Sequence, residues 1–270
     1  MKNNIKLSLN AFSFNAVLNG GALSLDGLLE FASEQKFAGI DLTAYYVPGY
    51  PEVPKDQVLY EIKRKAALLG LHISGTGVRN DFTVEDATKR HKDVQLVKDW
   101  TIAASKLGAP IMRIFSGTQP VAPSNWATVA ERMVGDIKEC VAFGADHGVI
   151  VALQNHNDFI QTAEHVDFFI ERVGSPWFGL VLDIGSYSRL DPYDEIARNV
   201  RHAVSWQIKE KVNHFGEPKD VDLSRIAEII GESEYHGYLL VETLGPGDPH
   251  EKVRAFSESV RGAFGSNLSV

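Results

Sequence analysis

Residues 149–159 read VIVALQNHNDF, an apolar run that ends abruptly in side chains able to accept or donate hydrogen bonds. A short unbroken apolar run is typical of a strand buried on both faces, because a half-exposed strand would alternate with polar residues. We therefore expect a buried strand that opens onto a site at its C-terminal end. The polar side chains there are Gln154, Asn155, His156 and Asn157, followed by Asp158.

Seven further apolar runs recur along the chain, each followed by a helical pattern, as strand–helix units require. They read IKLSLNAF, FAGIDLTAYY, LHISGTGV, APIMRIFSG, FGLVLDIG, AVSWQIKE and YLLVETLG. Ser24 is expected to cap the first helix, and Gly108 to end the second. The expected helices span residues 25–36, 85–107, 126–147, 162–173, 192–201, 223–231 and 249–264.

Eight such units predict an α/β fold, a (β/α)8 TIM barrel, formed by a single domain over residues 1–270. An open doubly wound sheet is the alternative, although it normally has fewer strands. Dinucleotide-binding sheets of that type carry a Gly-rich phosphate loop, and the segment GTGVRN lacks its spacing. The barrel is therefore the favoured architecture.

The composition argues against several classes of protein. A formal net charge of -8 and the lack of a basic stripe disfavour nucleic-acid binding. No apolar run approaches the ~20 residues of a membrane helix. Cys140 is the single cysteine, so no internal disulfide can form and a buried thiol is expected. We expect a cytoplasmic protein with a small-molecule partner, and homo-oligomerisation stays open.

In TIM barrels the reactive groups lie at the C-terminal ends of the strands. Asp183 and Glu242 each close an apolar run, so both should be partly buried, and buried carboxylates need partners. Salt bridges to Lys209 or Arg113 would satisfy them without a metal. Arg113 is also expected to tie strand ends together. The strand-end candidates are Arg113, Ser116, Gln154, His156, Asp183, Gln207, Lys209 and Glu242.

Five motifs, RIFSG, LQNH, LVLDIG, WQIKE and LLVE, stand in this order at the expected strand ends. Together they resemble the xylose isomerase-like barrels, the sugar phosphate isomerases and epimerases, over nearly the whole chain. The resemblance implies a sugar or sugar-derived substrate and a divalent metal. Asp183 and Glu242 match two of the metal ligands of that family. Gln154 replaces a glutamate ligand, Gln207 replaces a histidine ligand, and Ser186 replaces a further histidine.

The resemblance thus implies a metal set of Gln154, Asp183, Gln207 and Glu242. These are four oxygen donors with two formal negative charges, and hard divalent cations accept amide oxygens. Fewer carboxylates should weaken binding, and the loss of an imidazole shifts the preference to Mg²⁺ or Mn²⁺, with Ca²⁺ also open. In the alternative, the two glutamine side chains hydrogen-bond the carboxylates and no metal binds.

For the chemistry, we expect Glu242 to act as a base beside a substrate carbonyl, with His156 as a second acid or base. Lys209 would stabilise the developing oxyanion. Gln154 cannot accept a proton near neutral pH, which disfavours a two-base epimerisation. One-base isomerisation, elimination by a lyase, and a non-catalytic sugar-binding barrel stay open. Substrate contacts are expected from Arg113, Phe12, Phe14, Tyr45, Trp206 and Ser186.

Overall fold

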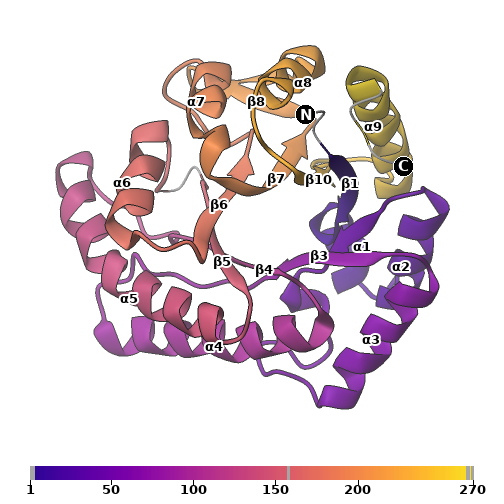
Figure 1. Ribbon diagram of the computed structural model, residues 1–270, viewed down its shortest axis with the longest axis horizontal. Coiled ribbons are helices and arrows are strands. Elements are labelled where there is room, and N and C mark those ends of the chain that lie inside the picture. The colour runs from indigo at the N-terminus through magenta and orange to yellow at the C-terminus, as the bar shows by residue number, and fades with distance from the viewer. Residues whose placement is uncertain (1–3, 157–158, 266–267, 269–270) are drawn as a thin grey trace.

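The computed structural model describes residues 4–156, 159–265 and 268. Eight parallel strands close into a barrel in the order β1-β10-β7-β6-β5-β4-β3-β2 (Figure 1). The predicted (β/α)8 TIM barrel is therefore confirmed. The barrel strands are β1 Ile5–Asn10, β2 Gly39–Asp41, β3 His72–Gly77, β4 Ile111–Ile114, β5 Ile150–Gln154, β6 Phe178–Asp183, β7 Ala203–Lys209 and β10 Gly237–Glu242.

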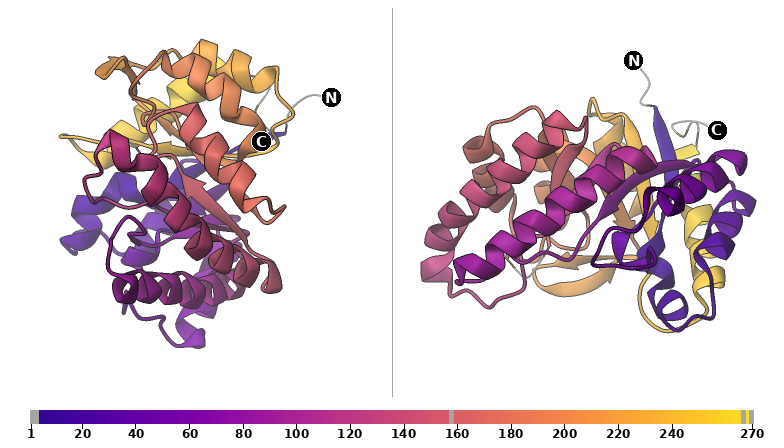
Figure 2. Two further views of the ribbon diagram at one scale, coloured as in Figure 1. Left: turned by 90° about the vertical axis from the view of Figure 1, so that its left-hand side faces the viewer. Right: turned by 90° about the horizontal axis from the view of Figure 1, so that it is seen from below.

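The helices form an outer ring around the barrel (Figures 1 and 2). Among the helices of the described residues, none is long and apolar enough to cross a membrane. The helices are α1 Asn15–Asn19, α2 Leu25–Glu34, α3 Asp56–Leu68, α4 Ala87–Leu107, α5 Trp126–Asp146, α6 Ala163–Val173, α7 Pro192–Asn199, α8 Leu223–Gly231 and α9 Pro249–Phe264.

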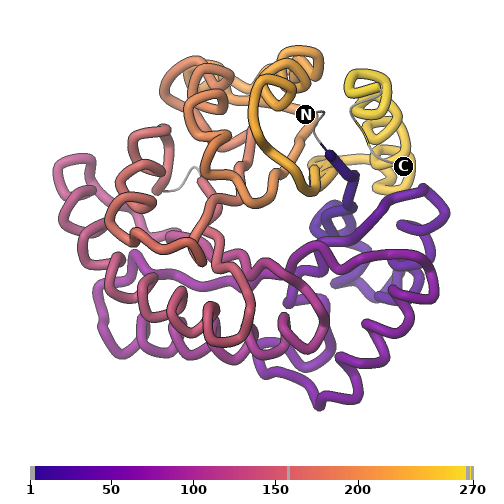
Figure 3. Tube along the Cα trace, viewed as in Figure 1, coloured from indigo at the N-terminus to yellow at the C-terminus, as the bar shows by residue number. Residues whose placement is uncertain are grey.

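The chain runs once around the ring, so that its last strand lies beside its first (Figure 3). β1 pairs with β10 in register from Ile5 and Gly237 onward. An isolated bridge between Ile5 and Leu268 adds a second link between the two ends of the chain. Closure leaves no unpaired edge strand in the barrel, which removes the usual template for edge-to-edge aggregation.

Short polar side chains begin most of the long helices. The side chain of Ser24 accepts a hydrogen bond from the Gly27 backbone N–H at 3.0 Å, as predicted, and Gly108 ends α4 with a φ of 80°. Such caps satisfy backbone donors that a helix leaves free at its first turn. The same role is played by Asp86, Thr162, Asp191, Asp222 and Asp248.

Two elements have no bounds in the sequence prediction. The helix α3 is expected from the strand–helix pattern, but its bounds could not be placed because its buried face is narrow, formed by Leu59, Ile62 and Ala66 among many charged residues. The second is an antiparallel hairpin, β8 Lys211–His214 with β9 Glu217–Asp220, inserted after β7. Phe215 and Gly216 turn the hairpin with φ angles of 52° and 88°, and a two-residue turn with positive φ at both positions matches the twist of the paired strands.

Side chains inside the barrel form layers. Ile111, Ala152 and Val181 make a small apolar cluster separate from the main core. Residues two positions further along the same strands share the same face, because successive strand side chains alternate. The next layer on these strands is Arg113, Gln154 and Asp183, so an apolar plug supports a polar layer at the C-terminal end of the barrel.

Two glycines of α5 differ in how closely they lie to other atoms, and one of them packs directly on β5. A Cβ at Gly144 would lie 2.6 Å from the Val149 carbonyl oxygen and 2.8 Å from Val151 Cγ2, whereas a Cβ at Gly135 meets nothing within 4 Å. We predict that Gly144→Ala lowers the free energy of unfolding by about 1–3 kcal/mol through overpacking. Gly135→Ala should raise it by roughly 0.5–1 kcal/mol, because alanine costs less entropy in a helix.

Urea titrations of the two variants measure both effects. Equal free energies of unfolding for Gly144→Ala and Gly135→Ala would contradict the close approach of α5 to β5.

Candidate functional site

The C-terminal ends of the strands bring together a buried polar cluster. Its centre is the ammonium group of Lys209, at the end of β7. Lys209 Nζ lies 2.7 Å from Asp183 Oδ2 and 3.1 Å from Glu242 Oε1. The side chain of Asp183 is fully buried, that of Glu242 is 5% exposed, and that of Lys209 is 15% exposed. One lysine therefore holds the two carboxylates predicted at the ends of β6 and β10.

The electrostatics of this trio follow from the short distances. Burial alone would lower the pKa of Lys209, but the charges of Asp183 and Glu242 outweigh it and raise that pKa above its ordinary value. Burial works to raise the pKa of Asp183, yet the Lys209 charge and hydrogen bond hold it below its ordinary value. Lys209 is therefore an ammonium and Asp183 a carboxylate at neutral pH.

Neutral groups complete the hydrogen bonding of the two acids. Gln154 Nε2 donates to Asp183 Oδ2 at 2.8 Å and to Gln207 Oε1 at 2.6 Å. The Gly185 backbone N–H donates to Asp183 Oδ1 at 3.0 Å, and Asn10 Nδ2 donates to Glu242 Oε2 at 2.9 Å. Each of the four carboxylate oxygens thus accepts at least one hydrogen bond from the protein. Gln154 Oε1 is buried and has no partner among the described residues.

A cavity of about 290 Å³ lies directly against this cluster. Lys209, Glu242, His156 and Ser186 line it, and Val212 and Asn213 of the hairpin form part of its wall. Asn213 Nδ2 donates to the Gly185 carbonyl oxygen at 2.6 Å, which fixes the hairpin to the loop after β6. The volume approaches the lower end of the range for small-molecule sites.

The opposite part of the mouth is organised by Arg113. Its Nη1 donates to the Val78 carbonyl oxygen and its Nη2 to the Tyr45 hydroxyl, each at 3.1 Å, while its guanidinium lies 4.0 Å from the centre of the Phe115 ring. The Phe12 and Tyr45 rings pack edge to face, with their centres 6.4 Å apart. Arg113 ties strand ends together, as expected from the sequence.

The sequence analysis missed two polar residues of this cluster, Asn10 and Asp41. Asn10 ends β1 and holds Glu242, whereas Asp41 ends β2 and is 7% exposed. Burial raises the pKa of Asp41 to about 6. The positive charge of Arg113 opposes this rise, and the negative charge of Glu242 adds to it. The signal was present, since Asp41 closes the run FAGID in the same way that Asp183 closes LVLD.

Alternate glycines on β3 make room for both charged groups. A Cβ at Gly75 would lie 2.8 Å from Asp41 Oδ2, and a Cβ at Gly77 would lie 2.6 Å from Arg113 Nε. Both distances are shorter than van der Waals contact, so larger residues would displace the acid or the guanidinium. The motif SGTG of β3 therefore shapes the polar layer through the absence of side chains.

A family model described as "Xylose isomerase-like TIM barrel" matches residues 29–261. The chain belongs to this family. A comparison of the sequence with curated proteins gave no match.

Solved structures of the same fold cover almost the whole chain. A D-psicose 3-epimerase from Clostridium cellulolyticum H10, solved with D-tagatose, is 16% identical with a TM-score of 0.74, over 96% of this chain and 99% of that one. A probable 3-DHS dehydratase from Bacillus anthracis is 17% identical with a TM-score of 0.72, over 94% and 98%. A zinc-bound IOLI protein is 14% identical with a TM-score of 0.79, over 98% and 100%.

Xylose isomerase-like barrels typically bind a divalent metal. A divalent cation needs oxygen lone pairs at about 2.0–2.6 Å. Here the ammonium of Lys209 stands between Asp183 and Glu242, and the amide nitrogen of Gln154, not its oxygen, faces Asp183. No group of three His, Cys, Asp or Glu within the described ranges could hold a metal ion. As arranged, the residues do not fit a divalent cation.

The predicted metal set is nevertheless assembled as a cluster. Gln154 bonds Asp183 and Gln207, and Lys209 links Asp183 to Glu242. In this arrangement Gln154 hydrogen-bonds a carboxylate directly. Gln207 accepts a hydrogen bond from Gln154, and among the described residues it donates none to Asp183 or Glu242.

Two expected substrate contacts are wrong. Trp206 precedes Gln207 on β7, so its side chain points out of the barrel; it is fully buried and packs on Tyr235 with ring centres 5.9 Å apart. Phe14 is also fully buried and packs on Phe31 and His250. Both are core residues. Asn157 and Asp158, which follow the predicted strand end, lie outside the described residues.

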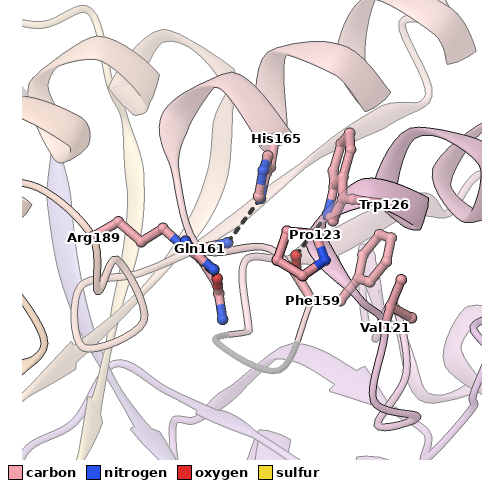
Figure 4. A pocket seen from close by; sticks show the side chains of 7 residues that line it. All are labelled: Val121, Pro123, Trp126, Phe159, Gln161, His165 and Arg189. Atoms are coloured by element: carbon pink, nitrogen blue, oxygen red, sulfur yellow. Dashed lines mark hydrogen bonds between the residues drawn. The ribbon is translucent and has the colours of Figure 1, made fainter.

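A second cavity of about 160 Å³ lies beside the mouth of the barrel (Figure 4). Trp126 stacks on His165 with ring centres 4.0 Å apart, and Arg189 Nε donates to Gln161 Oε1 at 2.6 Å. The described residues that line it include no carboxylate. It therefore lacks a carboxylate base such as Glu242, although His165 lines it.

Asp41 predicts a pH dependence of stability. A buried acid with a raised pKa binds its proton more tightly in the folded state, so its stabilising effect is complete at low pH and is lost as the pH rises from about 4 through about 6. At pH 7.5, Asp41→Asn should therefore unfold with a free energy higher by up to about 3 kcal/mol.

The gain of Asp41→Asn should shrink as the pH falls towards 4, as measured by urea unfolding at pH 4.5 and 7.5. Parallel stability curves for the two proteins would show that Asp41 titrates as an ordinary aspartate.

Proposed function

We propose that this chain is a sugar-modifying enzyme that transfers a proton at the carbon next to a carbonyl of a sugar or polyhydroxy acid. The observation that carries the proposal is the pair of Glu242 and Lys209 at the floor of a cavity of about 290 Å³, where a carboxylate and an ammonium face the same space. Membership of the xylose isomerase-like family supports it. The fold is also that of a D-psicose 3-epimerase and a probable 3-DHS dehydratase.

The proposed steps use groups of this chain alone. Glu242 removes the proton from the carbon beside the carbonyl, and the electron pair of the broken C–H bond moves into the carbonyl to form an enediolate. The Lys209 ammonium stabilises the negative oxygen, as preorganised donors do where charge develops. His156 is proposed as the second acid or base, and it lines the same cavity.

From the enediolate, two outcomes are open. Return of the proton to C1, with transfer of the O2 hydroxyl proton to O1 through His156, converts an aldose to a ketose. Departure of a β-hydroxyl with a proton instead gives an unsaturated product and water. A symmetric two-base epimerisation is disfavoured, because Gln154 cannot accept a proton and its amide nitrogen already donates to Asp183. Arg113, Phe12, Tyr45 and Ser186 remain proposed substrate contacts.

A second candidate is a sugar-binding barrel without catalysis. The observation that favours it is the hydrogen bonding of the acids, since each carboxylate oxygen of Asp183 and Glu242 accepts a hydrogen bond from the protein. Hydrogen bonds to the charged form of an acid favour that form, so a carboxylate held in this way is a weaker base. The two candidates predict the same ligands and differ in turnover.

The test is isotope exchange in D₂O over a panel of aldoses, ketoses and sugar acids, followed by proton NMR and mass spectrometry. Wild-type protein should incorporate deuterium next to the carbonyl of its substrate. Glu242→Gln should lower the exchange rate by roughly 10²–10⁴-fold, because the amide cannot act as the base.

Glu139→Gln is the matched control, because Glu139 is an exposed acid on α5 that pairs with Lys98. It should exchange at the wild-type rate. A sugar that binds by calorimetry without exchange in any of the three proteins would contradict the enzyme and favour the binding barrel.

A further inference from the structure

The two carboxylates at the centre of the site share one cation supplied by the chain itself. Lys209 Nζ lies within 3.1 Å of both Asp183 and Glu242, the two residues that match metal ligands of the family. We infer that the Lys209 ammonium takes the position of the family's divalent metal, and that the enzyme works without one. This inference rests on the proposed function for its catalytic part only.

The cluster carries fewer negative charges than the metal set that the family implies. Gln154 and Gln207 are neutral where the family implies a glutamate and a histidine, so Asp183 and Glu242 supply the only formal negative charges of the predicted metal set. A site with fewer carboxylates binds a doubly charged ion less well. The same two carboxylates are neutralised in part by one ammonium, which also repels any further cation.

The packing around Lys209 places its ammonium in the cluster. The aliphatic part of the side chain runs past Gly185, where a Cβ would lie 3.1 Å from Lys209 Cδ. Gly185 also donates its backbone N–H to Asp183. This glycine therefore leaves space for the lysine stem while it orients the acid that the lysine binds.

The hydrogen-bond count shows how the ammonium can serve a substrate. A lysine ammonium has three N–H donors. Two are directed to Asp183 Oδ2 and Glu242 Oε1, and Lys209 also lines the cavity. Among the described residues the third donor has no partner, so it is available to a carbonyl oxygen, to which it supplies a positive charge that a metal would otherwise provide.

Calorimetric titration of the EDTA-dialysed full-length protein with MnCl₂ tests the position of the cation. Wild-type protein should show no saturable binding up to about 1 mM Mn²⁺. Lys209→Ala should bind one Mn²⁺ at least about 100-fold more tightly than wild type and should gain thermal stability with added Mn²⁺, because its two carboxylates are left without a cation.

Lys65→Ala is the matched control. Lys65 also bridges two carboxylates, Asp26 at 3.0 Å and Glu30 at 2.8 Å, but those acids are 65% and 56% exposed. Removing this lysine should create no Mn²⁺ site, since solvent already hydrates both acids. Binding by Lys65→Ala equal to that of Lys209→Ala would show a general effect of lost lysines and overturn the inference.

Two other results would also overturn it: saturable Mn²⁺ binding by wild type that Glu242→Gln abolishes, or folded Lys209→Ala that binds no Mn²⁺. Lys209→Ala that folds only with Mn²⁺ present would support it. If that variant folds under neither condition, the wild-type titration decides alone, because it requires no substitution.

The exchange assay separates this inference from the proposed function. Exchange that survives EDTA treatment supports both. Exchange that is lost with EDTA and restored by Mn²⁺ overturns the metal-free inference and retains the enzyme. Exchange absent under every condition overturns the enzyme, while the Mn²⁺ titrations still decide which cation the carboxylates hold.

Discussion

The ion pair of Lys209 with Asp183 and Glu242 is the constraint on which the mouth of the barrel depends. Two carboxylates this deeply buried require a positive partner, and removing one partner of a buried pair costs roughly 3–5 kcal/mol. The surrounding neutral donors, Gln154 and Asn10, then have fixed orientations because they complete the hydrogen bonding of the same acids. One cation on β7 thus organises side chains from four other strands.

The barrel makes this convergence possible. Its parallel strands all end at one rim, and the alternation of side chains directs every second residue inward. The apolar layer of Ile111, Ala152 and Val181 closes the interior below the polar layer. Water is thereby excluded from one side of the cluster, which strengthens the interactions between its charges.

The sequence was sufficient to predict the barrel, because each strand–helix unit repeats a clear pattern. Asp183, Lys209 and Glu242 could be predicted as site residues, because each stands at the end of a strand and the strand ends meet at one rim of the barrel. Asp41 was not predicted, because the segment of β2 was interpreted from its apolar run and its last residue was not considered as a strand-end candidate. The assignment of Trp206 failed for a different reason: once Gln207 is taken to point inward, its neighbour must point outward. Which amide nitrogen faces which acid depends on packing and could not be predicted.

The hairpin β8–β9 has a consequence for how this site can diversify. It follows Lys209 after a single residue, pairs only with itself in the described sheets, and supplies cavity wall through Val212 and Asn213. The floor of the cavity belongs to the barrel, whose register is fixed on both sides of every strand. Changes in hairpin length or sequence can therefore reshape what the cavity admits while the reactive groups keep their geometry, so selectivity and chemistry are encoded by separable segments of the chain.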